Sequence, residues 1–479
     1  MRLLPLILTA IASPLLAAFA TVVVRGWKRG AVVAAFSLLV SAAMLSLSIG
    51  RCLKEQYELE PTLGLVVLEG NDFNLAFSLA ICLLSAAAVL CAPSFLERSH
   101  RRGTPASFYA LYLVSAAALV ATPLSGTLTT FFVFFETYLV ASWLLLLFWG
   151  GRGRGAAALT YLVFTEAGAL LTLLGIAVVY DAYGTLNFEQ LKTALASAPP
   201  ADLAFPLALL AAGPLVKMAI VPFHAWLPGV YSSAPVPLLV AMTLAEGTGG
   251  WALVKLLVLT APSALNEAWF RRPLLVLAAL TAIYGSLTAL AQKDARRLLA
   301  YSTVSQSGYM LLGIACGGRL AVASALLFFL SHSIAKAVLL TDFGYLEELS
   351  ETSSLEGFGG LASSMPATAV STLVSFLSLA GIPPTLGFWA ELGVLAGTVK
   401  LFLNSGVAGL AVAATLSAST VFSAAYGLLC FKRVFFGPPR LRLEEKLSGP
   451  VAVALTLSLV SVALGAYPAL PLGALAQLP

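Results

Sequence analysis

Residues 213–228, GPLVKMAIVPFHAWLP, decide how the rest of the chain is interpreted. The stretch is apolar enough to lie in a membrane, yet it contains Lys217, His224 and three prolines. A lysine at the centre of a bilayer costs roughly 2.5 to 3.5 kcal/mol, so Lys217 needs a partner or a water-filled path. Pro222 interrupts the helix and frees backbone polar groups, which persist at membrane depth only beside protein or water. A buried charge next to a helix break indicates an ion pathway, with Pro222 and His224 as candidate gate residues.

The composition of the whole chain predicts a polytopic membrane protein of the all-α class. Of its 479 residues 59% are hydrophobic and 10% are charged, and the mean hydropathy is +0.94, whereas soluble domains carry about 25% charged residues. Apolar runs of membrane-spanning length predict about fourteen transmembrane helices in one bundle. They lie near residues 3–24, 31–49, 74–96, 106–122, 126–149, 156–180, 204–228, 233–259, 273–291, 296–316, 319–345, 366–400, 406–432 and 449–470.

The distribution of the 27 Lys and Arg residues predicts the orientation. Sixteen fall on one side of the membrane, in loops near residues 25–29, 98–102, 152–154, 293–297 and 432–446. Nine fall on the other side, and Lys217 and Lys336 remain as the only basic side chains placed inside spans. By the positive-inside rule the first side is cytoplasmic. We therefore expect both termini to lie outside a prokaryotic plasma membrane.

The cysteines and histidines give no sign of a bound metal. The five Cys and three His residues are scattered, and none forms a C-x-x-C pair or a Cys–His cluster. We expect no metal site, iron–sulfur cluster or other cofactor in this chain, so any redox centre would belong to a partner subunit. The net charge of +5 comes without a basic cluster that contains aromatic residues. Nucleic acid is therefore not an expected partner.

Six ionisable groups fall near the middle of predicted spans: Glu136, Lys217, Glu246, His332, Lys336 and Glu391. At about 3 kcal/mol each they would cost on the order of 18 kcal/mol if unpaired, so they must pair, hydrate or be neutral. Four residues separate His332 from Lys336, which places both on one helix face where a proton could pass between them. Glu166 also lies in a span, where we expect it to serve helix packing, and Asp342 lies near a span end.

A second proline break follows the first at a distance of five spans. Pro383 and Pro384 interrupt the run LSLAGIPPTLGFWAELG, and Glu391 lies just beyond them. Two discontinuous helices at corresponding positions are typical of membrane proteins built from repeats, in which the breaks mark the pathway. The layout therefore predicts two repeats of five helices.

Several of these stretches resemble one family of membrane subunits. KMAIVPFHAWLPGVYSSAPVP, residues 217–237, is similar to its pattern of a lysine, then P-x-H-x-W-L-P, then A-P-x-P. The family comprises the antiporter-like subunits shared by respiratory complex I, group 4 membrane-bound hydrogenases and Mrp-type cation/proton antiporters. Supporting stretches are YLVFTEAGALLTLLGIAVVY, GTLNF, DARRLLAYSTVSQSGYMLLGI, SHSIAKAVLL and SLAGIPPTLGF, in the family's order.

The resemblance implies a fourteen-helix bundle with two inverted five-helix repeats. The implied divisions are 1–105 for helices 1–3, 106–260 and 261–432 for the two repeats, and 433–479 for the last helix. By position, Glu136 would pair with Lys217, Lys336 and His332 would form the central relay, and Glu391 would be the terminal group. The implied function is proton translocation along a hydrated axis at the membrane midplane, with no catalytic redox centre in this chain.

Two departures from the family pattern leave questions open. Many relatives carry a base on the eighth span, but here MTLAEGTGGWALVK has Gly247 roughly at that position and Glu246 beside it. Either Glu246 replaces the base or water alone makes the link. Many relatives also have lysine where Glu391 stands, and a glutamate there favours a redox-driven complex of the complex I or hydrogenase type. We expect other membrane subunits and a soluble module with iron–sulfur, flavin or nickel–iron centres as partners. The alternatives are an Mrp-type Na⁺/H⁺ antiporter subunit and an inactive scaffold.

Overall fold

The computed structural model describes residues 3–24, 26–50, 55–58, 67–97, 103–405 and 407–469. The described residues leave out several positions that entered the predictions above. These are Arg25, Cys52, residues 98–102 with His100, and both chain ends. The long helices are α1 (Leu4–Val23), α2 (Trp27–Ser48), α3 (Asp72–Leu96), α4 (Pro105–Ala121), α5 (Leu128–Trp149), α6 (Arg154–Tyr183), α8 (Pro200–Lys217), α10 (Val236–Leu253), α12 (Ala268–Leu290), α13 (Ala295–Cys316), α14 (Arg319–Ser350), α15 (Pro366–Leu379), α16 (Leu386–Ser405), α17 (Val407–Phe435) and α18 (Gly449–Ala466).

Shorter elements connect these helices. They are the strands β1 (Glu55–Glu58) and β2 (Val67–Gly70), the helices α7 (Phe188–Ala196), α9 (Leu227–Ser233) and α11 (Pro262–Asn266), the 3-10 turns η1 (Thr122–Leu124) and η3 (Leu355–Gly357), and the π-helix η2 (Val254–Thr260). The predicted helical, multi-span membrane fold is confirmed. In the described part of the chain, twelve helices are long and apolar enough to cross a membrane. The predicted spans at 296–316 and 366–400 coincide with α13 and with α15 and α16, which fall outside that set of twelve.

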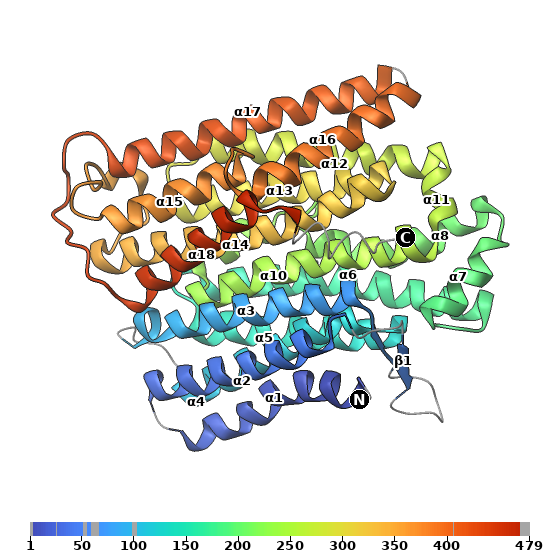
Figure 1. The fold of residues 1–479 in the computed structure, drawn as a ribbon, viewed down its shortest axis with the longest axis horizontal. Helices are drawn as coiled ribbons and strands as arrows, with labels where there is room; N and C mark the ends of the chain where they lie inside the picture. The colour runs from blue at the N-terminus through green and yellow to red at the C-terminus, as the bar shows by residue number, and fades with distance from the viewer. Residues whose placement is uncertain are drawn as a thin grey trace.

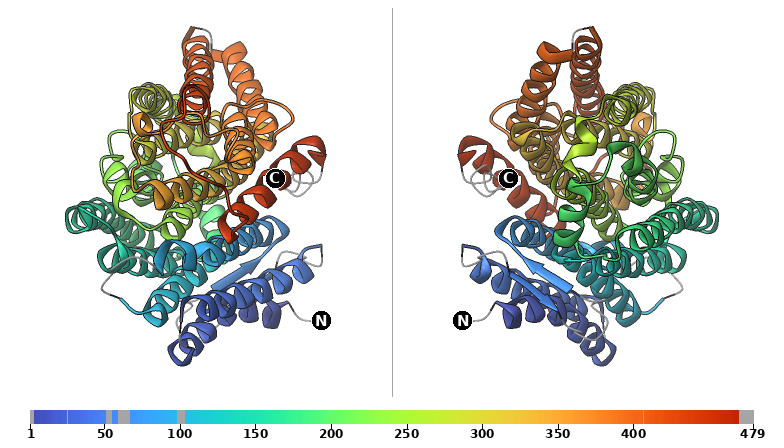
Figure 2. Two further views of the ribbon diagram at one scale, coloured as in Figure 1. Left: turned by 90° about the vertical axis from the view of Figure 1, so that its left-hand side faces the viewer. Right: turned by 90° about the vertical axis from the view of Figure 1, so that its right-hand side faces the viewer.

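The long helices run side by side in one bundle (Figure 1). The N-terminal helices α1 to α5 form one side, and α12, α13 and α15 to α17 form the other, with α10 and α14 between them (Figures 1 and 2). In the membrane-spanning window of α10 with η2 every residue is buried, and in that of α14 94% are. These two helices therefore form the centre of the bundle, and it is they that carry Glu246, His332 and Lys336.

The first break separates α8 from α9 immediately after Lys217. Ala219 has a left-handed φ of +52°, and the peptide bond between Val221 and Pro222 is cis. Other parts of the protein satisfy the backbone groups that the break frees, because the Trp226 indole donates to the Val216 carbonyl at 3.1 Å and Val221 N–H donates to the Thr281 hydroxyl at 3.1 Å. Such a break is tolerated at membrane depth only with partners of this kind.

The second break, between α15 and α16, repeats the backbone geometry of the first. Three successive N–H groups donate four, three and five residues back in both breaks: residues 218, 219 and 220 in the first, and residues 380, 381 and 382 in the second. Gly381, with φ +60°, takes the place of Ala219, and the Pro383–Pro384 bond is cis. The two predicted interruptions are thus one local structure that occurs twice.

A small antiparallel hairpin, which the sequence pattern did not predict, pairs Glu55 with Gly70 and Glu58 with Val67. Its strand β2 is buried on all four residues and presents Glu69 to Lys255 on η2. Their atoms Oε2 and Nζ are 2.6 Å apart, and both side chains are at most 4% exposed. The prediction that Lys217 and Lys336 are the only basic side chains inside spans is therefore wrong, because Lys255 lies buried in the span Val236–Thr260. Lys255 lies at the end of its helix, where the carboxylate from β2 reaches it.

Candidate functional site

Lys217 ends α8 deep inside the bundle, where its side chain is 2% exposed. The ammonium donates to the Tyr161 hydroxyl at 2.7 Å, and that hydroxyl lies 2.8 Å from the Ser142 hydroxyl. The ammonium also lies 4.2 Å from the centre of the Tyr138 ring and 5.1 Å from that of Tyr161. An ammonium over aromatic faces gains on the order of 2 kcal/mol when desolvated. Helices α5 and α6 therefore hold Lys217 through ring faces and a hydroxyl.

Glu136 lies on α5, half-buried, and its Oε1 atom is buried without a hydrogen-bond partner. Its charge interacts with those of Lys217 and Glu166, but it forms no ion pair with Lys217 among the residues that the structure describes. Glu136 and Lys217 therefore interact at a distance in this conformation, without the direct ion pair that was predicted. The transport roles predicted for both residues stay predictions.

Glu246 occupies the centre of α10 and is 1% exposed. Both of its carboxylate oxygens are buried without a hydrogen-bond partner. It is close enough to Lys217 and Lys336 for both lysines to act on its charge. No other carboxylate among the described residues is coupled in this way to both lysines. Glu246 therefore lies within electrostatic range of both lysines.

The packing around Gly247 explains why no basic side chain occupies position 247. A Cβ added to Gly247 would overlap the ring of Phe329 on α14. That ring is fixed in turn by stacking on Phe77, with ring centres 4.3 Å apart. The space beside α10 that a longer side chain at position 247 would need is thus filled by an aromatic ring.

Lys336 and His332 lie one turn apart on α14, and both are buried. The Lys336 ammonium donates to the Leu299 carbonyl at 2.5 Å and to the Ser302 hydroxyl, both on α13. The Nε2 atom of His332 is buried without a hydrogen-bond partner. The two residues share one face of α14, as their spacing predicted, and the charge of Lys336 acts on His332.

Glu391 lies on α16 beyond the second break and is 5% exposed. Its Oε1 accepts a hydrogen bond from the Thr420 hydroxyl, which lies 3.1 Å from the Tyr309 hydroxyl. Tyr309 and Ser302 are seven residues apart on α13, so they share a face and are separated by roughly 10 Å along the axis. One face of α13 therefore reaches from Lys336 to the surroundings of Glu391.

The other polar residues of α13 serve contacts between helices. Ser305 donates to the Ala282 carbonyl at 3.0 Å, Gln306 donates to the Leu379 carbonyl at 3.1 Å, and the Thr303 hydroxyl lies 3.0 Å from that of Tyr231. Each bond ties α13 to a different helix. In membranes, hydroxyl and amide side chains commonly link helices in this way.

The residues of the two breaks lie partly at the surface. Pro222, Pro383 and Pro384 are exposed, whereas His224 is half-buried and packs edge-on against Tyr284 with ring centres 4.9 Å apart. Helix α18 covers the second break, where the Trp389 indole donates to the Gly465 carbonyl at 2.7 Å. The breaks therefore adjoin the buried charges and extend to the outer face. Their predicted gating role stays a prediction.

Sequence reasoning missed the residues that hold the predicted groups in place. These are Tyr138, Ser142, Tyr161 and Thr420. Ser302 and Tyr309 belong to the run YSTVSQSGY, whose hydroxyls the sequence suggests either for a water path or for contacts between helices. One signal was available for Ser302 and Tyr309, because a seven-residue spacing puts both on one helix face. The tyrosines of α5 and α6 carried no signal, because the packing of two helices against Lys217 is a tertiary fact.

Asp342 is a further buried carboxylate, 2% exposed, on the same helix as Lys336. Its Oδ2 accepts hydrogen bonds from Ser371 at 2.6 Å and from Thr372 at 2.9 Å. Ser371 also donates to the Thr368 carbonyl, and the Thr368 hydroxyl donates to Glu445 at 2.6 Å. A chain of hydrogen bonds thus connects Asp342 to the loop before α18.

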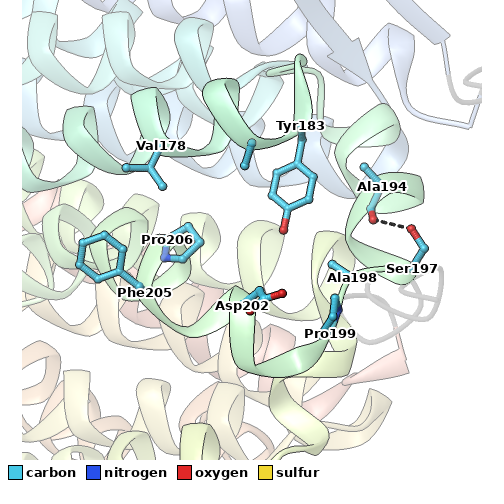
Figure 3. A pocket seen from close by; sticks show the side chains of 10 residues that line it. Val178, Tyr183, Ala194, Ser197, Ala198, Pro199, Asp202, Phe205 and Pro206 are labelled. Atoms are coloured by element: carbon cyan, nitrogen blue, oxygen red, sulfur yellow. Dashed lines mark hydrogen bonds between the residues drawn. The ribbon is translucent and has the colours of Figure 1, made fainter.

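A pocket of about 700 Å³ opens at the surface between α6, α7 and α8 (Figure 3). The Tyr183 hydroxyl and the Asp202 carboxylate face it, but none of the predicted pathway residues lines it. Among the described residues, no group of three His, Cys, Asp or Glu side chains is placed to hold a metal ion. The predicted pathway residues therefore lie apart from this pocket, most of them buried within the bundle.

The sequence and the fold match those of known proteins. Residues 125–420 match the family described as "NADH:quinone oxidoreductase/Mrp antiporter, TM". NADH-quinone oxidoreductase subunit N of Desulforudis audaxviator is 36% identical over 341 residues, which cover 70% of this chain and 67% of that protein. NAD(P)H-quinone oxidoreductase chain 4 1 of Synechococcus sp. (strain JA-3-3Ab) is 34% identical over 87% of this chain and 80% of its own length. A chain of respiratory complex I from Thermus thermophilus superposes with a TM-score of 0.86 at 27% identity and covers 98% of both chains.

Proposed function

Because this chain belongs to the NADH:quinone oxidoreductase/Mrp antiporter family of membrane subunits, we propose that it translocates protons as an antiporter-like subunit of a redox-driven, multi-subunit complex. The relatives are subunits of quinone oxidoreductases. In such a complex the redox centres would lie on partner subunits, and the end of the bundle that is rich in Lys and Arg would face the cytoplasm. The chain's own task is to hold and move protons.

The path begins at Lys217, beside Glu136. A nearby negative charge favours the protonated form of a lysine. A movement that brings Glu136 closer would therefore load Lys217, and its retreat would release the proton. The Tyr161 hydroxyl holds the ammonium at 2.7 Å in the absence of a carboxylate contact, which keeps Lys217 in place between these two states.

From Lys217 the path crosses to Lys336 through Glu246. Its two unpartnered oxygens are free to accept a proton or water, and its charge interacts with both lysines. This position of Glu246 is the observation that carries the proposal, because it turns two separate lysine sites into one line. An unpaired carboxylate this deep in a bundle is costly, so it is retained for function.

From Lys336 the path continues along α13 to Glu391. Ser302 accepts from Lys336, and Tyr309 reaches the Thr420 hydroxyl that donates to Glu391. His332 holds a ring nitrogen, Nε2, that has no hydrogen-bond partner among the described residues and lies one turn from Lys336. It would relay a proton only after Lys336 has given up its own, because two adjacent positive charges repel each other. Water must bridge the remaining gaps, and it must do so transiently because a permanent water wire would leak protons.

The alternative is an Mrp-type cation/proton antiporter, in which the same residues would exchange ions without a redox partner. The family's description includes both kinds of protein. We favour the redox complex because the relatives that match most of the chain are oxidoreductase subunits. A scaffold without transport activity would have no need to keep Lys217, Glu246 and Lys336 buried and coupled.

The substitution Glu246→Gln in the complex, purified through a tag on this chain and reconstituted in liposomes, tests the pathway. We expect proton uptake, followed with a pH-sensitive dye, to fall about tenfold or more, a loss of roughly 1.4 kcal/mol or more at the transfer step. Glu444→Gln, which neutralises an exposed carboxylate, is the matched control and should pump normally. Normal pumping by the Glu246 variant would remove Glu246 from the path.

Mass spectrometry of the same complex, with absorbance spectra for haem, flavin and iron–sulfur centres, separates the redox complex from the antiporter. Iron–sulfur or nickel subunits would support the redox-driven pump. A set of small membrane subunits without chromophores would favour the cation/proton antiporter.

A further inference from the structure

A second cavity, of about 690 Å³, lies at the end of the bundle where α12 and α17 approach the loops that follow them. It is at the left-hand end in Figure 1, far along the helices from α7 and the hairpin. Its walls come from the end of α12, from the segment around η3, from the last turns of α17 and from residues 436–440. None of the residues of the proton path lines it.

The cavity is lined by four basic side chains and one acidic side chain. Lys293, Lys432, Arg433 and Arg440 face a single carboxylate, that of Glu356. Lys293 forms an ion pair with Glu356 at 2.9 Å, and the Arg440 guanidinium donates to the Glu356 backbone carbonyl. The hydrogen bond and charge of Lys293, followed by the charges of Arg433 and Arg440, lower the pKa of the Glu356 carboxyl. The cavity therefore has a strong positive excess.

Two of the basic side chains are not engaged within the chain. Lys432 and Arg433, on the last turn of α17, are exposed and form neither an ion pair nor a side-chain hydrogen bond with any residue that the structure describes. Both positive charges lie at the C-terminus of α17, where the negative end of the helix dipole stabilises them. Their hydrogen-bond donors remain available to a ligand.

Backbone hydrogen bonds hold the loops around the cavity in place. Gly360 N–H donates to the Phe436 carbonyl at 3.1 Å, and Ala362 N–H donates to the Phe435 carbonyl at 3.0 Å. On the opposite wall Leu355 N–H donates to the Lys293 carbonyl at 2.8 Å. These bonds fix the two loops to the ends of α12 and α17, so the basic side chains project from defined positions.

One wall of the cavity is apolar and continues onto the membrane-facing surface. Leu429 is 42% exposed and Phe436 is 55% exposed, and both line the cavity. Leu429 lies on the spanning part of α17, one turn before Arg433. Apolar side chains that face hydrocarbon therefore adjoin basic side chains that face water, within one cavity.

We propose that this cavity binds an anionic phospholipid, with its phosphate held by Lys432 and Arg433 and an acyl chain lying along Leu429 and Phe436. Basic pockets between transmembrane helices at the membrane surface suit anionic headgroups. The fork of a guanidinium matches a phosphate, while an ammonium adds a point charge. A free phosphate would use the same two cations but would leave the apolar wall without a role.

Native mass spectrometry of the purified and delipidated complex, titrated with phosphatidylglycerol, measures the binding. We expect Lys432→Gln combined with Arg433→Gln to weaken the site about thirtyfold, since each cation near a lipid surface adds about a factor of five. The matched control combines Arg442→Gln with Lys446→Gln, which removes two exposed cations from the same end but outside the cavity. This control should retain the affinity within about threefold. Phosphatidylcholine should bind weakly and equally to all three proteins.

The substitution Leu429→Ser separates lipid from free anion. It should weaken phosphatidylglycerol binding and leave competition by inorganic phosphate unchanged. Equal losses in the two double variants would overturn the proposal by showing only diffuse attraction to the whole surface. An unchanged affinity of the Lys432 and Arg433 variant would overturn it too, as would a partner subunit that keeps the cavity lipid-free in the intact complex. Thermal unfolding of each variant confirms that it is folded.

Discussion

At the scale of single residues, the central lysine is held by aromatic rings and one phenol rather than by an acid. Tyr161 is the only hydrogen-bond partner of the Lys217 ammonium among the described residues, and the Tyr138 ring lies beneath it. A rigid phenol fixes the position of the ammonium and leaves its charge uncompensated. Lys217 can therefore respond to a carboxylate that moves nearby, which a lysine locked in an ion pair could not do.

The substitution Tyr161→Phe should slow proton pumping about tenfold while leaving the fold intact, because a hydrogen bond to a charged group contributes roughly 1.5 to 3 kcal/mol. The ring and its contact with Trp226 would remain, with ring centres 5.1 Å apart. Initial pumping rates in proteoliposomes measure the effect. Tyr180→Phe, which removes a hydroxyl from an exposed ring on the same helix, should match the wild type. Equal rates in both variants would contradict the positioning role of Tyr161.

The charged residues of the candidate site could be predicted from the sequence, whereas most of the residues around them could not. Lys217, Lys336 and Glu391 stand out because a charge in an apolar run is rare and costly. Their partners Tyr161, Ser302 and Thr420 do not stand out, because hydroxyl residues are ordinary in membrane helices. The position of Glu246 between two lysines depends on the packing of α10 against its neighbours, which periodicity does not contain.

At the scale of elements, the two helix breaks share one backbone geometry but differ at one residue. Ala219 adopts a left-handed φ in the first break, whereas Gly381 does so in the second. A side chain in this region costs roughly 1 to 2 kcal/mol, which glycine avoids. In the second break a Cβ would also meet the Glu391 carboxylate.

We therefore expect Gly381→Ala to lower the stability by about 1 to 3 kcal/mol and to reduce pumping, because it displaces Glu391. Ala219→Gly is the matched control at the corresponding position. It should be tolerated or slightly stabilising, since it removes the left-handed strain. Thermal unfolding in detergent and pumping rates measure both. Tolerance of alanine at residue 381 would show that Glu391 is free to move aside.

The hairpin is fastened to the bundle by the buried pair of Lys255 and Glu69. Removing one partner, as in Lys255→Met, should destabilise the protein by roughly 3 to 5 kcal/mol, because an unpaired carboxylate would remain buried. Replacing both, by Lys255→Met with Glu69→Leu, should restore much of the loss. The unfolding midpoints of the single and double variants test this. A double variant as unstable as the single one would assign the loss to packing instead of charge.

Element boundaries show where sequence patterns were sufficient. The apolar runs located the spanning helices, and the prolines located both breaks, because each feature is local in the chain. The hairpin and the amphipathic helix α7 were missed, since both lie in polar connections where no membrane constrains the pattern. Lys255 was misplaced because its partner on β2 lies 186 residues away in sequence.

At the scale of the whole molecule, the basic residues gather at one end of the bundle. The loop between α17 and α18 and the start of α13 lie together at the left-hand end in Figure 1. By the positive-inside rule we predict that this end is cytoplasmic. The proposed lipid site would then face the cytoplasmic leaflet, and the hairpin would face the outside.

Cysteine labelling in membrane vesicles tests this orientation. In a variant with the native cysteines replaced by serine, Arg442→Cys should react with an impermeant maleimide only when the cytoplasmic face is accessible. Lys192→Cys on α7 should react only from the opposite face. Both positions are exposed, so access to solvent is not limiting. Labelling of both from the same side would contradict the predicted topology.

The overlap between position 247 and Phe329 has a consequence for how this lineage can change. A proton carrier on the eighth span can occupy position 246 or position 247, and in this chain it is the acid Glu246. A lysine or histidine at position 247 would collide with Phe329, whose ring is stacked on Phe77. A smaller residue in place of Phe329 would have to come first, and it would leave a cavity in the core beside Phe77. A base at position 247 therefore needs a second change at Phe329, whereas the acid at Glu246 fits the bundle with the aromatic ring in place.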